Sequence, residues 1–526
     1  MAVANLSFHL DRTHLRLRLA LAVVAVVATV VGIVLGLRWP FRESAVIQSL
    51  RDASSSQVTI RSFRGVYFPH PGCVAEQVTF RREPSDPNTP PLISVRKLTV
   101  EGSFLGVITK HVTLIRADGM DVFIPAQSTN QRFRASSNVT VDDFTANGAT
   151  LQFGSPTPGK PSTKFAFHES TFRNLGGPGP ILFHAKLSNP EPPGEIDTIG
   201  RFGPWRPGDP LQSPVSGEYS FQHADLAVFK GIAGILSSTG KFQGVLERIA
   251  VQGTTDTPDF KVTSSSHHVR LKTQFKAFVN GRTGNVFLDE VDSGFGRTTV
   301  LTAGSIAPET GQEGRFTELN MQAKDGRIQD LFELFIKESR SPIAGVTSFR
   351  AHVLLPPKKH PFFKKVQLNG DFGIQAGEFT KSITQQDVDK LSAESRGQKD
   401  DNPETVLSDL KGHVELKDGI ATFSNLSFGV PGALAQMRGT YDLISGKVDL
   451  HGTLKMDAAV SHTAHGPKAL LFKLVDPFFK KKPRGSEVPV KITGTYRHPS
   501  FGLELSGRKK NRNAKELERL YQSRRK

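Results

Sequence analysis

The sequence contains little cysteine, tyrosine, tryptophan or methionine. Its single cysteine, Cys73, excludes an intrachain disulfide and a metal cluster held by several thiolates. The 526 residues include 37 Phe but only 5 Tyr and 2 Trp, and a phenylalanine ring carries no polar group that needs a partner when it is buried. The chain therefore folds without disulfide bonds, and its aromatic side chains suit an extended apolar surface.

The sequence also lacks the common motifs of catalysis and metal binding. In GILSSTGK, residues 234–241, five residues instead of four separate the glycines and no Ser or Thr follows the lysine, so the stretch fails as a phosphate-binding loop. No G-x-S-x-G motif occurs, and His462 and His465 lack the glutamate of a zinc-protease helix. Adjacent carboxylates such as Asp142 and Asp143 diverge on a strand and cannot act together on one substrate. We expect neither an enzyme nor a cofactor or metal site.

Basic residues outnumber acidic ones by 67 to 50, which gives a formal net charge of +17. Such an excess suggests an anionic partner, either nucleic acid or a phospholipid surface. The tail, residues 508–526, holds nine basic and two acidic residues, so it alone contributes +7. Because the sequence contains no recognisable nucleic-acid-binding module, we expect no nucleic-acid partner.

One hydrophobic run is long enough to cross a membrane. Residues 19–37, LALAVVAVVATVVGIVLGL, are uncharged, and a helix of this length spans roughly 28 Å, close to the thickness of a bilayer core. A cleavable signal peptide is the alternative, but its apolar core is usually shorter, and Arg38-Trp39-Pro40 stands where a small-residue cleavage site belongs. We predict a retained single transmembrane helix. The long polar remainder has no second hydrophobic span and lies on one side of the membrane, and its strand-rich composition suits the periplasm of a double-membrane bacterium.

Beyond this run the hydrophobic period is two, which is typical of strands with one buried face. In VRLKTQFKAFV, residues 269–279, apolar side chains alternate with long polar ones. VQLNGDFGI, residues 366–374, repeats the pattern, a third such strand follows Ser445-Gly446-Lys447, and Asp418-Gly419 predicts a hairpin turn. We predict a mainly β protein whose apolar sheet face includes Leu271, Phe275, Val279, Leu368, Phe372, Ile374, Val448, Leu450 and Leu454.

Helical periodicity is rare in the sequence. Short helices are predicted at 43–53, at 327–338 and at 468–479, where three lysines follow ALLFKLVDPFF. The third helix could lie in a bilayer interface or close the end of a sheet. Two connectors are also predicted, an excursion from the sheet at 188–214, which is rich in proline and glycine, and a mobile loop at 392–403.

A short motif occurs twice. GTTDTPDF, residues 253–260, returns as GTYRHPSF, residues 494–501, and each copy follows an alternating strand. We interpret both copies as equivalent hairpins, because glycine permits a bend and proline fixes φ where the next strand begins. The residues shared by the two copies are Gly253, Pro258, Phe260, Gly494, Pro499 and Phe501.

The order of these elements resembles the AsmA-like family, relatives of TamB and YhdP. A basic N-terminus, a transmembrane helix, ESAVIQSLRDAS and VTIRSFRGVYFPHPGCVAEQVTFRR are similar to the family's opening. LKGHVELKDGIATFSNLSFGVPGALAQMRGTYDLISGKVDLHGTLKM resembles its C-terminal region, and ADLAVFKGIAGILSSTGKFQGVLERIAVQGTTDTPDF resembles the middle segment of a larger subgroup. The expected segments are a cytoplasmic N-terminus (1–18), the transmembrane helix (19–37), an N-terminal AsmA-like region (38–125), a middle β-groove region (126–345), a C-terminal AsmA-like region (346–507) and a basic tail (508–526).

The resemblance implies a long curved antiparallel sheet that forms a groove with an apolar concave face, as in the bridge-like lipid transfer proteins. It further implies a role in phospholipid transport toward the outer membrane and in envelope integrity. The expected partners are phospholipids, the inner membrane, and outer-membrane or other envelope proteins. Independently of the resemblance, an apolar sheet face with few helices needs a cover, either a second sheet layer or a ligand such as acyl chains. The alternative function is an anchored scaffold or assembly factor for outer-membrane proteins that conducts no lipid.

Overall fold

The computed structural model describes residues 41–54, 56–81, 90–103, 106, 109, 111–124, 140–153, 163–177, 179–204, 206, 209–229, 231–263, 265–281, 285–308, 315–336, 340–357, 361–398, 403–457, 486–495 and 498–503. The predicted transmembrane helix (19–37), the predicted helix at 468–479 and the basic tail (508–526) lie outside these residues. Within the described ranges, no helix is long and apolar enough to span a membrane.

The fold is mainly β, as the period of two predicts. Twenty-five strands among the described residues form one long, open, largely antiparallel sheet, and the helices are few and short. The strands are β1 (Gln57–Thr59), β2 (Ser62–Val66), β3 (Gly72–Arg81), β4 (Ile93–Gly102), β5 (His111–Ile124), β6 (Thr140–Phe153), β7 (Thr163–Leu175), β8 (Ile181–Pro190), β9 (Pro193–Phe202), β10 (Pro214–Asp225), β11 (Ile232–Ala233), β12 (Ile235–Val245), β13 (Arg248–Val262), β14 (Val269–Val279), β15 (Val286–Phe295), β16 (Thr298–Pro308), β17 (Arg315–Arg327), β18 (Ile343–Leu355), β19 (Gln367–Phe379), β20 (Ser408–Lys417), β21 (Ile420–Val430), β22 (Ala433–Asp442), β23 (Lys447–Met456), β24 (Ser486–Thr495) and β25 (His498–Leu503). The helices are α2 (Glu43–Ser54), α4 (Ile328–Phe335), α5 (Phe362–Lys365) and α6 (Ser382–Ser395), with short 3₁₀ turns at Pro210–Gln212 and Leu226–Val228.

The chain forms two compact units. The first comprises Met1–Phe260, Arg270–Asp292 and Ser305–Pro308, and the second comprises Lys261–Val269, Ser293–Gly304 and Glu309–Lys526.

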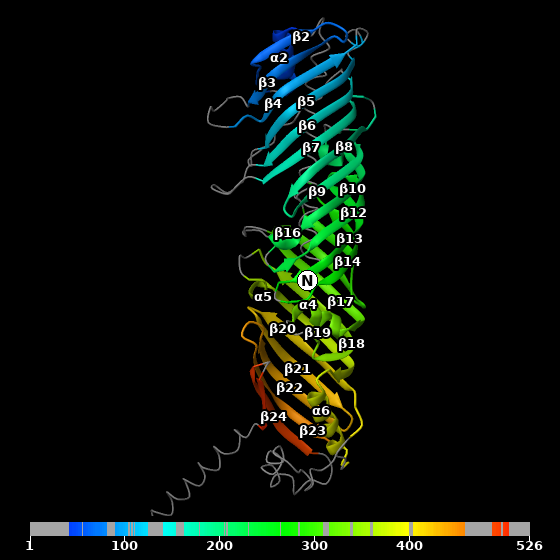
Figure 1. Cartoon of the computed structure of the whole chain (residues 1–526), viewed down its shortest axis with the longest axis vertical. Helices are drawn as coiled ribbons and strands as arrows, with labels where there is room; N and C mark the ends of the chain where they lie inside the picture. The colour runs from blue at the N-terminus through cyan, green and yellow to red at the C-terminus, as the bar shows by residue number, and fades with distance from the viewer. Residues whose placement is uncertain are drawn as a thin grey trace, which may run out of the picture. The chain divides into compact units, whose positions relative to one another are not determined.

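In the first unit, α2 lies beside the first strands and successive strands lie side by side (Figure 1). Its core is formed by side chains from one face of the strands, and Phe144, Phe165, Phe202 and Phe260 are among the largest that are fully buried. β5 and β6 run parallel to each other, whereas the pairs from β6 to β10 and from β10 through β12 to β13 are antiparallel.

Irregular positions interrupt several strands of this unit. Gln77 on β3 and His223 on β10 have positive φ values, and the register of β10 against β12 shifts between Phe221 and Ala224. Extra residues of this kind bend a strand and increase its twist. These irregular positions therefore contribute to the curvature of the sheet.

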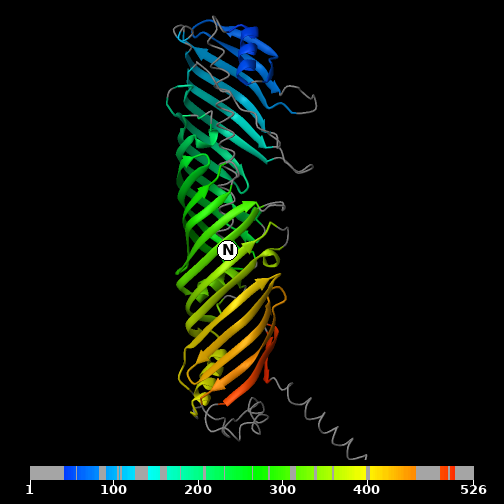
Figure 2. The same ribbon diagram turned by 180° about the vertical axis from the view of Figure 1, so that it is seen from behind.

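In the second unit, the strands from β17 to β25 are hydrogen-bonded in succession and antiparallel throughout. Figures 1 and 2 show this part of the sheet as curved, with α6 against one side of it. Register shifts between Ile374 and Gly377 on β19 and between Phe423 and Leu426 on β21 contribute to the curvature.

The repeated motif does not mark two equivalent hairpins. The second copy lies where β24 and β25 pair, with Gly494 opposite Pro499 and Gly494 at a φ of +102°. The first copy lies within β13, which continues through Gly253 and Pro258 without a turn and buries Phe260. The predicted hairpin at the first copy is therefore wrong.

The reason for the glycine in the first copy is close packing. Gly253 faces Gly240 on β12, and a Cβ atom on Gly253 would lie 2.5 Å from the carbonyl oxygen of Thr239 and 3.1 Å from Cζ of Phe275. Glycine at this position leaves space for the neighbouring strand and for an aromatic ring. The sequence pattern does not distinguish a glycine with this packing role from a glycine in a turn.

The predicted excursion at 188–214 is wrong for its first half, which contains β9, whereas the described residues between 203 and 213 lie outside the strands. β9 pairs with β8 on one side and with β10 on the other. Its Gly194 and Gly200 face aromatic rings, because a Cβ atom on either residue would come within 2.8 Å of Phe221 or 2.6 Å of Phe183, respectively. The glycines that suggest a loop instead leave space for side chains on a regular strand.

Candidate functional site

The predicted groove residues of the second unit lie on one face of its sheet. Directly paired residues in antiparallel strands project from the same side, so each row of pairs can be followed from strand to strand. The three rows are Leu368–Leu416–Ala421–Tyr441–Val448, Gly370–Val414–Phe423–Gly439–Leu450–Ile492 and Ile374–Leu410–Phe428–Ala435–Leu454–Val488. Phe372 alternates with Gly370 and Ile374 on β19 and so projects from the same face.

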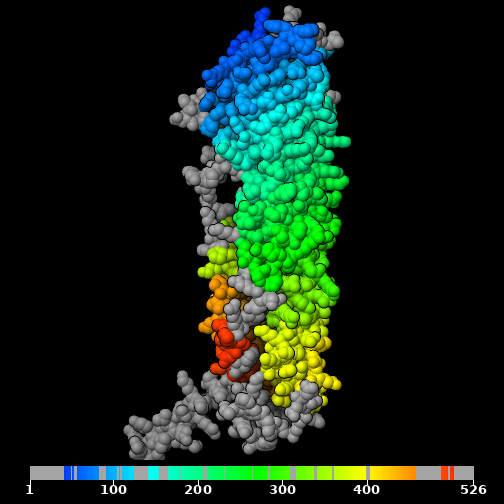
Figure 3. Space-filling view, viewed as in Figure 1, coloured from blue at the N-terminus to red at the C-terminus, as the bar shows by residue number. Residues whose placement is uncertain are grey.

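Part of this face is half exposed. We call the apolar strip the set Leu368, Phe372, Val414, Phe423, Leu450 and Ile492, all of which retain solvent contact. The rings of Phe372 and Phe423 meet edge to face, with 6.2 Å between their centroids. In the space-filling view, β22 to β25 and the yellow part of the chain that holds α6 stand on opposite sides of a recess in this unit (Figure 3).

Two helices cover the third row, along one rim of the face. Ile328 of α4 packs with Ile343 and Ile374, and Leu410 borders this cluster. Val388 of α6 packs with residues at the ends of β21 to β24, and Leu454 borders that second cluster. Ile374 is therefore buried and Leu454 is partly buried. The residues of the apolar strip are not members of these two clusters and keep more contact with solvent than Ile374 does.

Polar contacts fix α6 in this position. Gln385, 6% exposed, accepts a hydrogen bond from the Phe379 amide (2.8 Å) and donates to Oδ1 of Asp389 (2.7 Å) and to the Val406 carbonyl (2.9 Å). Oδ1 of Asp389 also accepts from the Val406 amide at 2.9 Å. A turn later, the hydroxyl of Ser392 donates to the Pro431 carbonyl at 2.7 Å. The helix is tied to the strand ends by buried hydrogen bonds as well as by apolar contact.

The predicted groove residues of the first unit have a different environment. Leu271, Phe275 and Val279 on β14 are 3%, 5% and 0% exposed, so all three lie within packed core. The alternate residues Arg270 and Lys276 are exposed. The predicted two-faced strand is thus observed, but the apolar face of β14 is buried rather than open.

Ion pairs between neighbouring strands cover the opposite face in both units. In the first unit, Lys276 bonds Glu290 at 2.7 Å and Arg270 bonds Asp256, and this hydrogen bond holds the pKa of Asp256 below its usual range. In the second unit, His413 bonds Asp371 at 2.8 Å. In these strands one side is therefore apolar and the other carries charged side chains in water.

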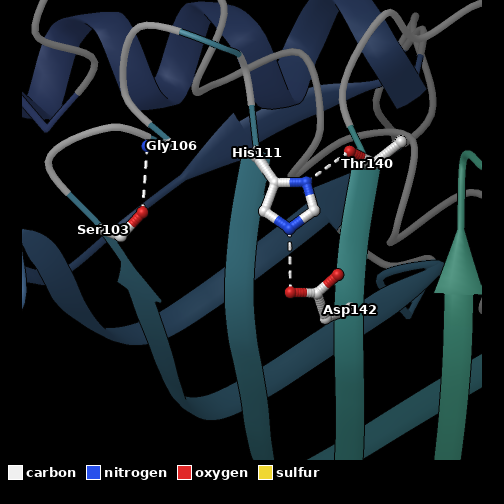
Figure 4. Close-up of polar contacts among 5 residues, drawn as sticks. All are labelled: Ser103, Gly106, His111, Thr140 and Asp142. Carbon is white, nitrogen blue, oxygen red and sulfur yellow. Dashed lines mark hydrogen bonds and ion pairs between the residues drawn. The ribbon is translucent and has the colours of Figure 1, made fainter.

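A cluster of polar side chains lies where β5 and β6 begin. The imidazole of His111 is 2.8 Å from the Thr140 hydroxyl through Nδ1 and 2.8 Å from Asp142 through Nε2, while the Gly106 amide donates to the Ser103 hydroxyl nearby (Figure 4). These three side chains join the two parallel strands across their exposed face. Among the residues that the structure describes, no three His, Cys, Asp or Glu side chains are grouped so as to hold a metal ion.

Two buried groups have strongly perturbed acidity in the first unit. Burial raises the pKa of the Cys73 thiol to about 12 and that of Tyr219 to about 12, the latter against an opposing hydrogen bond with Ser238. Both groups are neutral at physiological pH, and a thiol in this state is a poor nucleophile. Cys73 is therefore a packed core residue.

Sequence reasoning missed half of the apolar strip. Val414, Phe423 and Ile492 are not among the predicted residues, although Phe423 stands at the centre of the strip. The register shift after Phe423 places Ser424 and Asn425 in succession on the exposed side, which breaks the alternation that marks the other strands. A search that allows one extra residue in a strand would have found it.

Comparison of the chain with protein-family models, curated proteins and solved structures gives no match. The fold and the site together define a mainly β protein with one long, open, largely antiparallel sheet, one of whose faces is apolar.

Proposed function

We propose that the protein is an AsmA-like membrane-anchored protein that holds phospholipid acyl chains against the apolar face of its sheet. The observation that carries the proposal is the apolar strip, whose aliphatic and aromatic side chains come from five strands, β19, β20, β21, β23 and β24, with Gly439 of β22 between Phe423 and Leu450, and all retain solvent contact. An apolar surface of this kind in contact with water favours an apolar ligand. The resemblance of the sequence to the AsmA-like family supplies the identity of that ligand.

The strip would act by hydrophobic contact alone. Transfer of each CH₂ group from water is worth about 0.8 kcal/mol, so a single acyl chain gains ample affinity from lying along Phe372, Phe423 and Leu450. The strip contains no charged side chain that would fix a ligand at one point. A tail can therefore move from strand to strand between sites of similar energy.

The wider role follows from the anchor and the family resemblance. The helix predicted at 19–37 would hold the chain in the inner membrane, with the sheet in the periplasm. In this setting the protein would contribute to phospholipid transport toward the outer membrane and to the integrity of the envelope, without covalent chemistry of its own.

Photocrosslinking tests the proposal at single-residue resolution. A photoreactive amino acid is placed in the full chain at Phe372 or Leu450 on the strip, or at the adjacent positions Asp371 and Asp449, which point to the charged face. We expect phospholipid adducts by mass spectrometry at the first pair of positions only. Equal labelling at all four positions, or none at any, would refute lipid binding by the strip.

An anchored scaffold for outer-membrane proteins is the second candidate, and the edge of the sheet favours it. In the described residues the register of β25 is recorded against β24, and a free strand edge can add a strand from another protein. Leu450→Asp should then leave function intact, whereas deletion of residues 508–526 or a block of the β25 edge should abolish it. The reverse pattern supports lipid binding.

A further inference from the structure

The loop between β2 and β3 exposes two aromatic side chains side by side. Tyr67 is 62% and Phe68 82% exposed, and Phe68 is the most exposed large hydrophobic residue among those described. Pro69 and His70 are exposed as well, so all four residues at the tip of the loop are open to solvent. Two aromatic side chains exposed side by side at the tip of a loop form a small apolar patch of a kind that suits a bilayer interface.

The loop lies beside Phe41, the first residue that the structure describes. Gly65 shows this, because a Cβ atom there would lie 3.5 Å from the carbonyl oxygen of Phe41 and 3.6 Å from the hydroxyl of Tyr67. Phe41 is itself 2% exposed and leads directly into α2. Phe41 and the aromatic loop thus lie side by side in the fold.

The predicted membrane span ends only four residues before Phe41. Four extended residues reach at most about 14 Å, and the polar layer on each side of a bilayer core is about 5 to 8 Å thick. Phe41 and the neighbouring loop must therefore lie at or close to the membrane surface if residues 19–37 span it.

The charges around the loop suit an anionic surface. Arg42, Arg51, Arg61 and Arg64 are all exposed, against two acidic residues, Glu43 and Asp52, between positions 41 and 71. Arginines beside exposed aromatic rings are a typical combination for the headgroup region, where rings enter the interface and cations meet phosphates.

We propose that the loop Tyr67–His70 seats its two aromatic side chains in the headgroup region of a bilayer that carries anionic phospholipids. This inference rests on the proposed membrane anchor. The loop gives the first unit a second attachment to the bilayer, in addition to the proposed anchor, and two attachments fix the orientation of the unit relative to the membrane.

A fluorescent depth probe tests the inference on the full chain. Cys73 is 1% exposed, so an introduced surface cysteine can be labelled selectively. Phe68→Cys carries an environment-sensitive NBD label, and the matched control is Ile444→Cys, an exposed apolar residue (55%) in the turn between β22 and β23. Both proteins are reconstituted in vesicles of phosphatidylethanolamine and phosphatidylglycerol that contain a lipid with a quencher near its headgroup.

We expect blue-shifted and quenched emission at position 68, with water-like emission at position 444. Removal of Arg61 and Arg64 as R61Q/R64Q, or replacement of phosphatidylglycerol by neutral lipid, should weaken the quenching at position 68. Water-like emission at position 68 in protein that stays with the vesicles during flotation would overturn the loop contact and leave the proposed function standing. Protein that fails to float with vesicles at all would overturn both the anchor and the loop contact.

Discussion

The attachment of α6 to the rim of the apolar face depends on one buried glutamine. Gln385 makes three hydrogen bonds, to the Phe379 amide, to Asp389 and to the Val406 carbonyl. Gln385→Met keeps the length and helix propensity of the side chain but removes all three bonds. At about 1 kcal/mol net for each bond, the docked helix should lose about 3 kcal/mol, which corresponds to about 150-fold in the equilibrium for local opening.

The neighbouring residue provides a matched control. Gln386 lies on the same helix but is exposed, so Gln386→Met changes the same chemistry without breaking a buried bond and should alter stability by less than about 0.5 kcal/mol. The assay is native-state hydrogen exchange by mass spectrometry, because a chain of 526 residues in two units is not expected to unfold in one step.

The peptides to compare contain the amides of Phe379 and Val406. In Gln385→Met these peptides should exchange about 150-fold faster than in the parent protein, while peptides from β22 and β23 away from the helix stay protected. Equal exchange in the two variants would show that the apolar contacts of Val388 hold α6 without the polar network, and the reasoning above would be refuted.

Further substitutions test the packing within each unit. Gly253→Ala places a Cβ 2.5 Å from a backbone oxygen and should cost about 1–3 kcal/mol, whereas Gly373→Ala, with its nearest neighbour at 3.9 Å, should be tolerated, as native-state hydrogen exchange of peptides from β13 and β19 can show. In the same assay Ile374→Ala at a 4% exposed site should lower the free energy of opening by about 2–5 kcal/mol, and Val346→Ala at a 39% exposed site by less than about 1 kcal/mol. Because the pKa of Tyr219 is raised to about 12, its stabilising contribution is present below pH 10 and lost as the pH rises toward 12. Tyr219→Phe should abolish the late tyrosinate absorbance, and an unchanged absorbance titration would contradict the assignment.

Local sequence signals predicted the elements that depend on local chemistry. Asp418 and Gly419 form the predicted turn, both with positive φ, between β20 and β21. The helices predicted at 43–53 and 327–338 are confirmed as α2 and α4, since each carries apolar residues at helical spacing. The alternation in β14 likewise gave the correct two faces of the strand.

The features that the sequence did not reveal depend on contacts between distant residues. α6 was missed, and its last residues fall in a predicted mobile loop, because it buries Gln385, Asp389 and Ser392 instead of an apolar stripe. The role of Gly253 depends on Phe275, a residue on the next strand, and no local pattern separates such a glycine from one in a turn. Whether an apolar face is buried, as at Phe275, or half exposed, as at Phe372, depends on what packs against it, and alternation carries no information on that.

The parallel pairing of β5 with β6 determines on which rim each later connection of the first unit falls. In an antiparallel meander, connections alternate between the two rims, so adding one hairpin leaves every later loop on its original rim and lengthens the sheet by about 9.6 Å. Adding a single strand moves every later loop to the opposite rim. A parallel pair has the same effect as one such strand, since β6 begins at the rim from which β5 began. Sheets of this design can therefore gain or lose two strands without moving their later loops to the other rim. When the number of added strands is odd, a parallel pair returns the later loops to their original rim.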